Sequence, residues 1–253
     1  MSRRLVQIGI VGLLMMSVAL CVPSMTYARP PGKNWHLVFD SEFQGNVIDR
    51  SQWAILNGWA NNNVVSRPKN CFLDGHGHLV LTLGRGTGCQ LASARYDGAG
   101  SNSYGIRVGD YVEARIWFPG PGIMPTPEIS NWPAFWAVGL HWPVGGEIDI
   151  AEATGGLSID YHSGTLNEDT GVVPGNWGNS WHTYAVYREV GTDGLYYDGQ
   201  LVRTISTHDS GHPESIMLTS GATGPTSPQD YCCGGPVNPE ARMLVDWVRA
   251  WRQ

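Results

Sequence analysis

The sequence contains few charged residues and no sign of a long helix. Asp, Glu, Lys and Arg make up 15% of the 253 residues and 42% are hydrophobic, which excludes a coiled coil and a disordered acidic chain. No long stretch has a helical period, and neither an internal repeat nor a low-complexity linker is present. The chain also lacks a CxxC pair and any His/Cys spacing typical of zinc sites. These absences indicate a folded protein without long helices and without a structural zinc.

The charge balance is acidic, with a formal net charge of −6 at pH 7. A negative surface repels phosphates, so the sequence argues against a nucleic-acid partner. It suits a neutral ligand, for which charge steering has no role.

Glycine, proline and tryptophan are plentiful, with 33, 16 and 11 copies. This composition suits many strands joined by turns. Strand-like runs follow one another at 79–83, 111–118, 132–140, 147–152, 183–188, 194–197, 201–205 and 243–251. Runs of this kind at short spacing predict an all-β sandwich, formed by one domain over residues 29–253.

The first 28 residues have the features of a signal peptide. Arg3 and Arg4 form a basic start, residues 5–21 are apolar, and Ala28 ends a stretch of small residues suited to cleavage. The apolar run is short for a membrane-spanning helix. We therefore expect residues 1–28 to be removed and the mature protein to be secreted, without stable insertion into a membrane; the export route stays open.

Four cysteines follow this leader: Cys71, Cys89, Cys232 and Cys233. An oxidising exterior favours disulfides, and four cysteines allow three pairings. Adjacent Cys232 and Cys233 rarely bond each other, because the ring is strained. Cys71 and Cys89 flank the predicted strand at 79–83 and are candidates for neighbouring strands, but the pairing stays open.

The most informative segment is residues 145–152, Gly-Gly-Glu-Ile-Asp-Ile-Ala-Glu. Alternation along a strand puts Glu147 and Asp149 on one face and the two isoleucines on the other. Strict alternation would then send Glu152 into the core, where an unpaired carboxylate is costly. One bulged residue at Ile150-Ala151 returns Glu152 to the acidic face, so we predict a bulge there.

Carboxylates in such a row suit glycoside hydrolysis. Retention of configuration requires a nucleophile and an acid/base about 5–5.5 Å apart. Like charges this close raise the pKa of one carboxyl, which keeps a proton available near neutral pH. The alternatives are a calcium site and a solvated acidic edge, although acidic clusters that bind cations usually lie on loops.

The row also resembles a known family. Residues 147–152 match the E-x-D-x-x-E signature of glycoside hydrolase family 16. Residues 132–136, Trp-Pro-Ala-Phe-Trp, resemble a segment of its laminarinase-like members. Further similarities in the family's order lie at 37–43, 112–116, 181–184, 197–202 and 245–249, so the resemblance covers nearly the whole mature chain.

This resemblance implies a concanavalin-like β-jelly-roll sandwich with the substrate cleft on its concave sheet. It assigns Glu147 as nucleophile, Asp149 as its helper and Glu152 as acid/base. The other candidate substrate-binding residues are Trp132, Trp136, Glu113, Arg115, His162 and Asn70. Strand alternation independently puts Glu113 and Arg115 on one face.

No cofactor is expected for catalysis. Asp246 resembles an acid that ligates a structural calcium in several family members, where backbone oxygens near Glu42 and Gly77 would complete the site. Two segments depart from the family pattern, the proline-rich 120–131 and the loop 219–239. We expect both segments to shape the ends of the cleft, so the family pattern does not determine the substrate.

The sequence thus predicts a monomeric, retaining endo-β-glucanase that acts on a polysaccharide, with β-1,3-glucan favoured. Mixed-linkage β-1,3-1,4-glucan and a galactan such as agar or carrageenan are rival substrates. A transglycosylase would use the same residues. A noncatalytic β-glucan-binding protein on this fold would lack the carboxylates.

Overall fold

The computed structural model describes residues 30–32, 34–58, 60–61, 64–83, 86–93, 104–164, 167–221 and 237–253. The expected signal peptide and the cysteines Cys232 and Cys233 lie outside these residues. Within them, no helix has the length and apolarity needed to cross a membrane.

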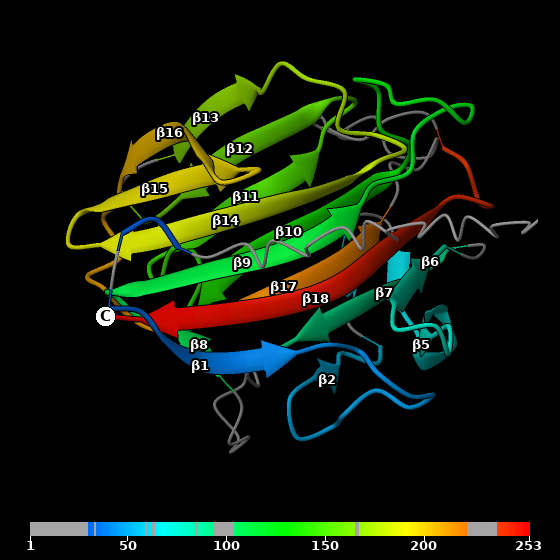
Figure 1. Cartoon of the computed structure of the whole chain (residues 1–253), viewed down its shortest axis with the longest axis horizontal. Coiled ribbons are helices and arrows are strands. Elements are labelled where there is room, and N and C mark those ends of the chain that lie inside the picture. The colour runs from blue at the N-terminus through cyan, green and yellow to red at the C-terminus, as the bar shows by residue number, and fades with distance from the viewer. Residues whose placement is uncertain are drawn as a thin grey trace, which may run out of the picture.

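Two sheets are packed face to face (Figure 1). One has eight strands in the order β16-β15-β14-β9-β18-β6-β5, with β1 paired to β18. Its strands are β1 (His36–Ser41), β5 (Cys71–Leu73), β6 (Leu79–Thr82), β9 (Asp110–Trp117), β14 (Trp181–Glu189), β15 (Thr192–Tyr197), β16 (Gln200–Ser206) and β18 (Arg242–Arg252).

The other sheet has ten strands in the order β13-β12-β11-β10-β17-β7-β4-β3, with β2 paired to β7 and β8 paired to β17. Its strands are β2 (Ala54–Ile55), β3 (Ala60–Asn61), β4 (Val64–Ser66), β7 (Thr87–Ala92), β8 (Gly105–Ile106), β10 (Trp132–Gly139), β11 (Glu147–Ala153), β12 (Leu157–His162), β13 (Asn167–Val172) and β17 (Glu214–Gly221). A single 3-10 turn, η1 (Pro68–Asn70), completes the described elements. The predicted all-β sandwich is confirmed.

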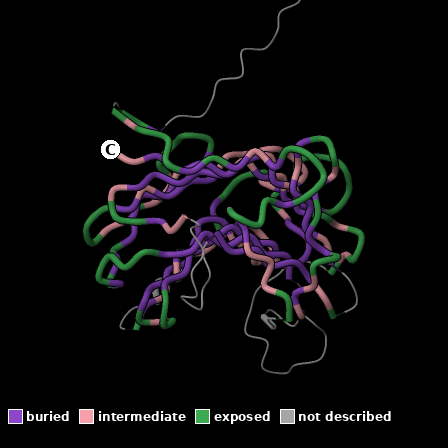
Figure 2. The backbone as a smooth tube through the Cα atoms, turned by 90° about the horizontal axis from the view of Figure 1, so that it is seen from below, coloured by how far each residue is buried: buried purple, intermediate pink, exposed green. Residues whose placement is uncertain are grey.

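Strand alternation fills the space between the sheets. Val112, Ala114 and Ile116 of β9 face inward and are fully buried, and Ile148 and Ile150 of β11 meet them from the other sheet as part of one core cluster. Figure 2 shows the two layers edge-on, with buried segments along the strands and exposed ones at the turns. A period of two in each sheet is therefore what creates the core.

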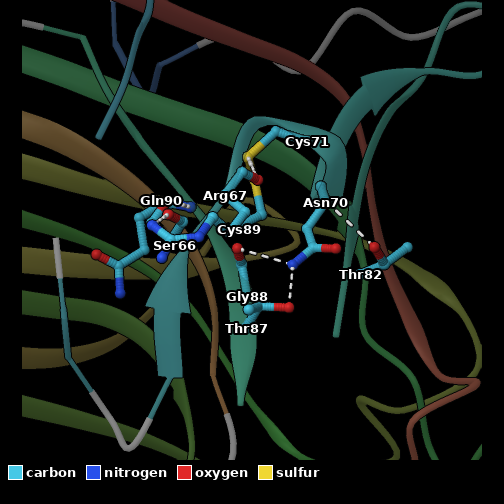
Figure 3. Close-up of a disulfide and its surroundings, with 9 residues drawn as sticks. All are labelled: Ser66, Arg67, Asn70, Cys71, Thr82, Thr87, Gly88, Cys89 and Gln90. Carbon is cyan, nitrogen blue, oxygen red and sulfur yellow. Dashed lines mark hydrogen bonds between the residues drawn. A yellow bond between two sulfur atoms is a disulfide. The ribbon is translucent and has the colours of Figure 1, made fainter. Parts of the chain in front are cut away.

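A disulfide joins the two sheets (Figure 3). Cys71 lies on β5 of the eight-stranded sheet and Cys89 on β7 of the ten-stranded sheet, with their Cα atoms 5.2 Å apart. The two cysteines thus lie on facing sheets and not on neighbouring strands of one sheet. A bridge over 18 residues stabilises a fold by about 3 kcal/mol, mainly by restricting the unfolded chain.

Candidate active site

The predicted bulge is present in β11. Against β10, Asp149 pairs with Trp136 and Ala151 pairs with Phe135, so Ile150 has no partner of its own. The register with β12 shifts in the same place, between Asp149 and Glu152. Ile150 and Ala151 are both fully buried, which leaves Glu152 on the opposite side of the strand from the core. The bulge therefore returns Glu152 to the face of Glu147 and Asp149. This agrees with the prediction, which rests on the free-energy cost of burying an unpaired carboxylate.

The acids lie on the outer face of the ten-stranded sheet. Residues directly opposite each other on antiparallel strands share a face, so the register identifies their neighbours. The rows across β10, β11 and β12 are Val138–Glu147–His162, Trp136–Asp149–Asp160 and Ala134–Glu152–Ser158. We call the surface formed by these three rows the carboxylate face.

Asp160 is a fourth carboxylate that the sequence analysis missed. It is 7% exposed, lies directly opposite Asp149, and accepts a hydrogen bond from Ser158 Oγ at 3.0 Å. Its signal was present in the sequence, because Ser158, Asp160 and His162 alternate with the buried Leu157, Ile159 and Tyr161. The same period-two argument, continued into the next strand, predicts Asp160.

The acids form two overlapping groups that share Asp149. Ligand-type atoms of Glu147, Asp149 and His162 lie within 4.8 Å of one another, and so do those of Asp149, Glu152 and Asp160. His162 Nε2 is 3.5 Å from Asp149 Oδ2. Asp149, only 3% exposed, is thus the centre of the row, with one glutamate on each side.

Two indoles hold the outer glutamates. Trp132 Nε1 donates to Glu152 Oε1 at 2.6 Å. The side chain of Trp142 donates to Glu147. Trp142 lies in the loop between β10 and β11 and is 54% exposed. Because an indole N–H is a donor only, each contact favours the ionised form of its glutamate and fixes its orientation.

The pKa values of the two glutamates are raised by different amounts. Burial raises the pKa of Glu147 to about 6, and nearby His162 and the bond from Trp142 limit that rise. Burial raises the pKa of Glu152 to about 8, with Asp160 and Glu147 adding to the rise and Trp132 opposing it. Burial, then Glu152 and Glu147, raise the pKa of Asp149 well above its usual value. Near neutral pH, Glu147 is the more readily ionised of the two glutamates, and Glu152 is the one that keeps a proton.

The two predicted aromatic residues share the carboxylate face. Trp132 and Trp136 are an even number of positions apart on β10, and Trp136 lies opposite Asp149. Trp136 is only 7% exposed and packs with Ala134, Val138 and Met217, so little of its ring is open. Trp132 is only half-buried, so its ring is the more accessible of the two. It also contacts Glu152. Contact of either ring with a sugar stays a prediction.

Glu113 and Arg115 do not join the site. Both share one face of β9, as expected, but β9 belongs to the eight-stranded sheet and its inward face carries the core residues. They therefore point away from the core on the far side of the sandwich from Glu147. Arg115 pairs with Asp246 at 2.5 Å and lies over the ring of Trp181. Alternation alone could not decide which sheet β9 joins, and the expectation that both residues line the cleft is corrected.

Asn70 is buried at 5% exposure beside the disulfide (Figure 3). Its amide nitrogen donates to Thr87 Oγ1 at 3.0 Å and to Gly88 O at 3.1 Å. Both amide hydrogens are used inside the protein, where they tie η1 to β7. The arrangement supports a structural role in place of the expected contact with sugar.

The residues expected at a calcium site do not fit that ion as arranged. Asp246 Oδ2 accepts from the guanidinium of Arg115, and the backbone oxygen of Glu42 accepts from Gln44 Nε2 at 3.1 Å. A guanidinium on the only carboxylate of the set neutralises the charge that calcium would need. Asp246 therefore acts through an ion pair on the outer face of the eight-stranded sheet.

Sequence comparison agrees with the region of the carboxylates. Residues 99–163 match the family model described as the XgeA-like, catalytic GH16 domain, and this segment includes Glu147, Asp149 and Glu152. An endo-1,3(4)-β-glucanase of Emericella nidulans is 41% identical over 56 residues, which is 22% of this chain and 9% of that protein. A probable endo-1,3(4)-β-glucanase of Aspergillus flavus is 39% identical over 56 residues, or 8% of its length. The matched part thus spans less than a tenth of these relatives, and the resemblance stated from the sequence is confirmed there.

Solved structures share the whole fold. The endo-β-1,3-glucanase of Pyrococcus furiosus has a TM-score of 0.67 and 21% identity, over 89% of this chain and 97% of that one. A pseudo β-1,3-glucanase of Mycobacterium tuberculosis has a TM-score of 0.65 and 22% identity, over 86% of this chain and 99% of that one. A structure reported for endo-acting O-glycanases of the human gut microbiota has a TM-score of 0.67 and 22% identity, over 89% of this chain and 93% of that one. At such identities the likeness confirms the jelly-roll sandwich. It does not identify the substrate, which has to be argued from the site.

Proposed function

We propose that this chain, a glycoside hydrolase of family 16 by its matched segment and its fold, is a retaining endo-acting hydrolase of β-glucan. The observation that carries the proposal is the bulged strand β11. It sets Glu147, Asp149 and Glu152 on one face, with the pKa of Glu152 raised further than that of Glu147.

In the first step Glu147 is the nucleophile. Its carboxylate attacks the anomeric carbon while the glycosidic C–O bond breaks, and the proton of Glu152 goes to the leaving oxygen. The products are a glycosyl ester on Glu147 and a shortened chain. The lower pKa of Glu147, near 6, supplies the carboxylate, and the higher pKa of Glu152, near 8, keeps the acid protonated at neutral pH.

In the second step Glu152, now ionised, takes a proton from water. The water oxygen attacks the anomeric carbon, and the bond to Glu147 breaks to regenerate the carboxylate. Asp149 lies between the two glutamates and its raised pKa favours a protonated form that donates a hydrogen bond to an ionised neighbour. Its place in the reaction is to orient Glu147 and to limit charge repulsion in the row.

The substrate class is supported by two observations. The relatives matched over 56 residues are named as endo-1,3(4)-β-glucanases, so cleavage of a β-1,3 bond is favoured. An acidic chain suits a neutral polysaccharide. No cofactor is required by the two-carboxylate chemistry. We further propose that the mature protein, from residue 29, is secreted as a monomer, which N-terminal sequencing and light scattering of the exported protein would test.

The central experiment compares wild type and Glu147→Ala on laminarin, lichenan, agarose and carrageenan. We expect reducing ends from laminarin with wild type and a loss of at least about 10⁴-fold in the variant. Added azide should restore cleavage of an activated β-glucoside in the variant and give the α-glycosyl azide. Activity on agarose or carrageenan alone would replace the glucan assignment, and binding without cleavage would make the chain a noncatalytic binding protein.

Product analysis decides two further points. Proton NMR of early products should show the β-anomer first, because a double displacement retains configuration. Initial α-product would place water between the carboxylates and overturn the mechanism. Products longer than the starting oligosaccharide, formed in preference to hydrolysis, would identify a transglycosylase.

A further inference from the structure

A buried cluster of charged side chains lies where the core between the sheets would otherwise be apolar. Arg188 continues the inward row of Tyr184 and Val186 on β14, and Glu214 starts the inward row of Ile216 and Leu218 on β17. With Asp193 of β15 and Asp209 of the loop before β17, they form a set whose exposed fractions are 2% or less. The cluster therefore connects the two sheets, and nothing in the proposed reaction uses it.

Arg188 is the centre of this cluster. Its Nη2 lies 2.9 Å from Asp209 Oδ2 and 3.5 Å from Glu214 Oε1, and its Nε lies 4.0 Å from Asp193 Oδ2. One guanidinium thus faces three carboxyl groups. Full ionisation would leave two uncompensated negative charges in the core, which is far more costly than protonation of a carboxyl.

Glu214 is the group whose surroundings require a proton. It is fully buried, and neither of its oxygens accepts a hydrogen bond from an N–H or O–H donor among the described residues. Its carboxyl is within hydrogen-bonding reach of Asp209. Asp209 Oδ1 in turn accepts from Gly211 N at 2.7 Å and Oδ2 from Arg188 Nη2 at 2.9 Å, so both of its oxygens act as acceptors. A proton on Glu214 that is donated to Asp209 satisfies both carboxyls.

Among the other titratable groups facing the pair, Asp193 acts in the same direction, Arg188 opposes it, and Tyr161 stays neutral. Burial raises the pKa of Glu214 well above its usual value, with Asp193 and Asp209 adding to the rise against Arg188. Burial also raises the pKa of Asp193 to about 7, with the charge of Arg188 opposing the rise and that of Asp209 adding to it. The hydroxyl of Tyr161 on β12 accepts from His208 N at 2.7 Å and stays neutral, because burial raises its pKa to about 12.

The cluster touches the start of the catalytic strand. Gly146 precedes Glu147 and has a φ of +84°. A Cβ placed there would lie 2.6 Å from Asp209 Cβ and 2.8 Å from Glu214 Oε1, so both carboxyls pack directly on this backbone. Gly146 O also accepts from Gly139 N at 2.9 Å, which closes the loop between β10 and β11. A shift of either carboxyl would therefore move the backbone that carries Glu147.

We propose that Glu214 and Asp209 share a proton beneath Gly146, and that this pair, locked by Arg188, is a positioning device for the nucleophile Glu147. The assignment of Glu147 rests on the proposed function. The shared proton does not, and it can be tested without any substrate.

The first experiment uses Glu214→Gln, which keeps a hydrogen-bond donor for Asp209 but cannot ionise. The infrared band of a protonated carboxyl should be present in wild type at neutral pH and weaker in the variant. Because the pKa of Glu214 is raised in the folded state, its contribution to wild-type stability is present below pH 4.5 and is lost as pH rises. The Tm of Glu214→Gln should therefore exceed that of wild type by an amount that grows with pH. A constant difference, or an unchanged infrared spectrum, would overturn the shared proton.

The second experiment tests positioning with the full chain. In Glu214→Leu, kcat should fall by roughly 10²-fold at nearly constant KM, as expected for a displaced reacting group, and Glu214→Gln should restore most of it. Gly146→Ala, whose Cβ meets the pair, should show the same loss. Gly199→Ala is the matched control, since Gly199 also has a positive φ but no atom within 4 Å of a Cβ.

Three outcomes separate the ideas. Equal kcat losses in Glu214→Leu and Glu214→Gln would show that charge at this position is needed and would refute the shared proton as the positioning element. Equal losses in Gly146→Ala and Gly199→Ala would attribute the effect to backbone strain alone. A wild type without hydrolytic activity would sink the proposed function, while the infrared and Tm measurements would still decide the proton.

Discussion

Trp132 donates its indole N–H to Glu152 at 2.6 Å, from the strand next to the one that carries the acid. The two residues are 20 positions apart in sequence. The contact opposes the rise in the pKa of Glu152 that burial and Asp160 cause. Trp132 thus sets how tightly the proposed acid holds its proton.

Replacement of Trp132 by phenylalanine tests this contact. Loss of a donor to the carboxylate raises the pKa of Glu152, so the basic limb of the pH profile of kcat/KM should move to higher pH than its wild-type position near 8. A hydrogen bond to a charged group contributes about 1.5–3 kcal/mol, which corresponds to an upward shift of about one to two pKa units. Trp35→Phe is the control, because its indole donates to Pro31 O at 2.9 Å. A basic limb that moves downward would contradict the assignment.

Asp160→Asn should shift the same limb in the opposite direction. Asp160 raises the pKa of Glu152 through its charge and a hydrogen bond, so a neutral amide lowers it. The basic limb of the pH profile should therefore move to lower pH. The acid limb near 6 should also move slightly to lower pH, because Asp160 raises the pKa of Glu147 as well. The measurement is kcat/KM from pH 4 to about 10 for both proteins. An unchanged profile would mean that Asp160 is only structural.

Glu152→Gln should separate substrates by leaving group. A poor leaving group needs the proton, so cleavage of a β-glucan oligosaccharide should slow by about 10²–10⁴-fold. An aryl glycoside with a good leaving group should lose far less in its first step. Pre-steady-state kinetics on both substrate types measure the difference. An equal loss for both, with the basic limb retained, would transfer the role of acid to another residue.

The same variant should be more stable than wild type. The folded-state pKa of Glu152 is raised from 4.5 to about 8, so its stabilising contribution is complete below about pH 4.5 and is lost as pH rises through 8. Glutamine does not titrate, and the Tm of Glu152→Gln should exceed that of wild type by a few degrees at pH 7 and converge with it at acidic pH. Thermal scans at pH 4, 6 and 8 would check this. A variant less stable at every pH would indicate that the carboxyl stabilises the fold.

Chelation should have no effect. Asp246 is paired with Arg115. On the carboxylate face, Glu152 accepts a hydrogen bond from an indole and its raised pKa keeps it protonated near neutral pH. We expect the same kcat and Tm before and after treatment with EDTA. A fall in either value that added calcium reverses would identify a cation site, either at Asp246 or in the acidic row.

The sequence by itself determined the local arrangement of the acids. Alternation in residues 147–152 and the cost of burying Glu152 required a bulge, and the structure contains it at Ile150. The same reasoning predicted that Trp132 and Trp136 share a face. These conclusions hold because the period of a strand and the penalty for a buried carboxylate are local properties.

Tertiary structure decided everything that depends on which strands become neighbours. Glu113 and Arg115 alternate correctly on β9, yet that strand joins the other sheet, and no local pattern encodes this choice. Asp160 and Trp132 meet Glu152 only through pairing across β10, β11 and β12, and so the pKa difference between the two glutamates arises from packing. The bridge between Cys71 and Cys89 and the cluster around Arg188 likewise join residues that the sequence separates, because both cross from one sheet to the other.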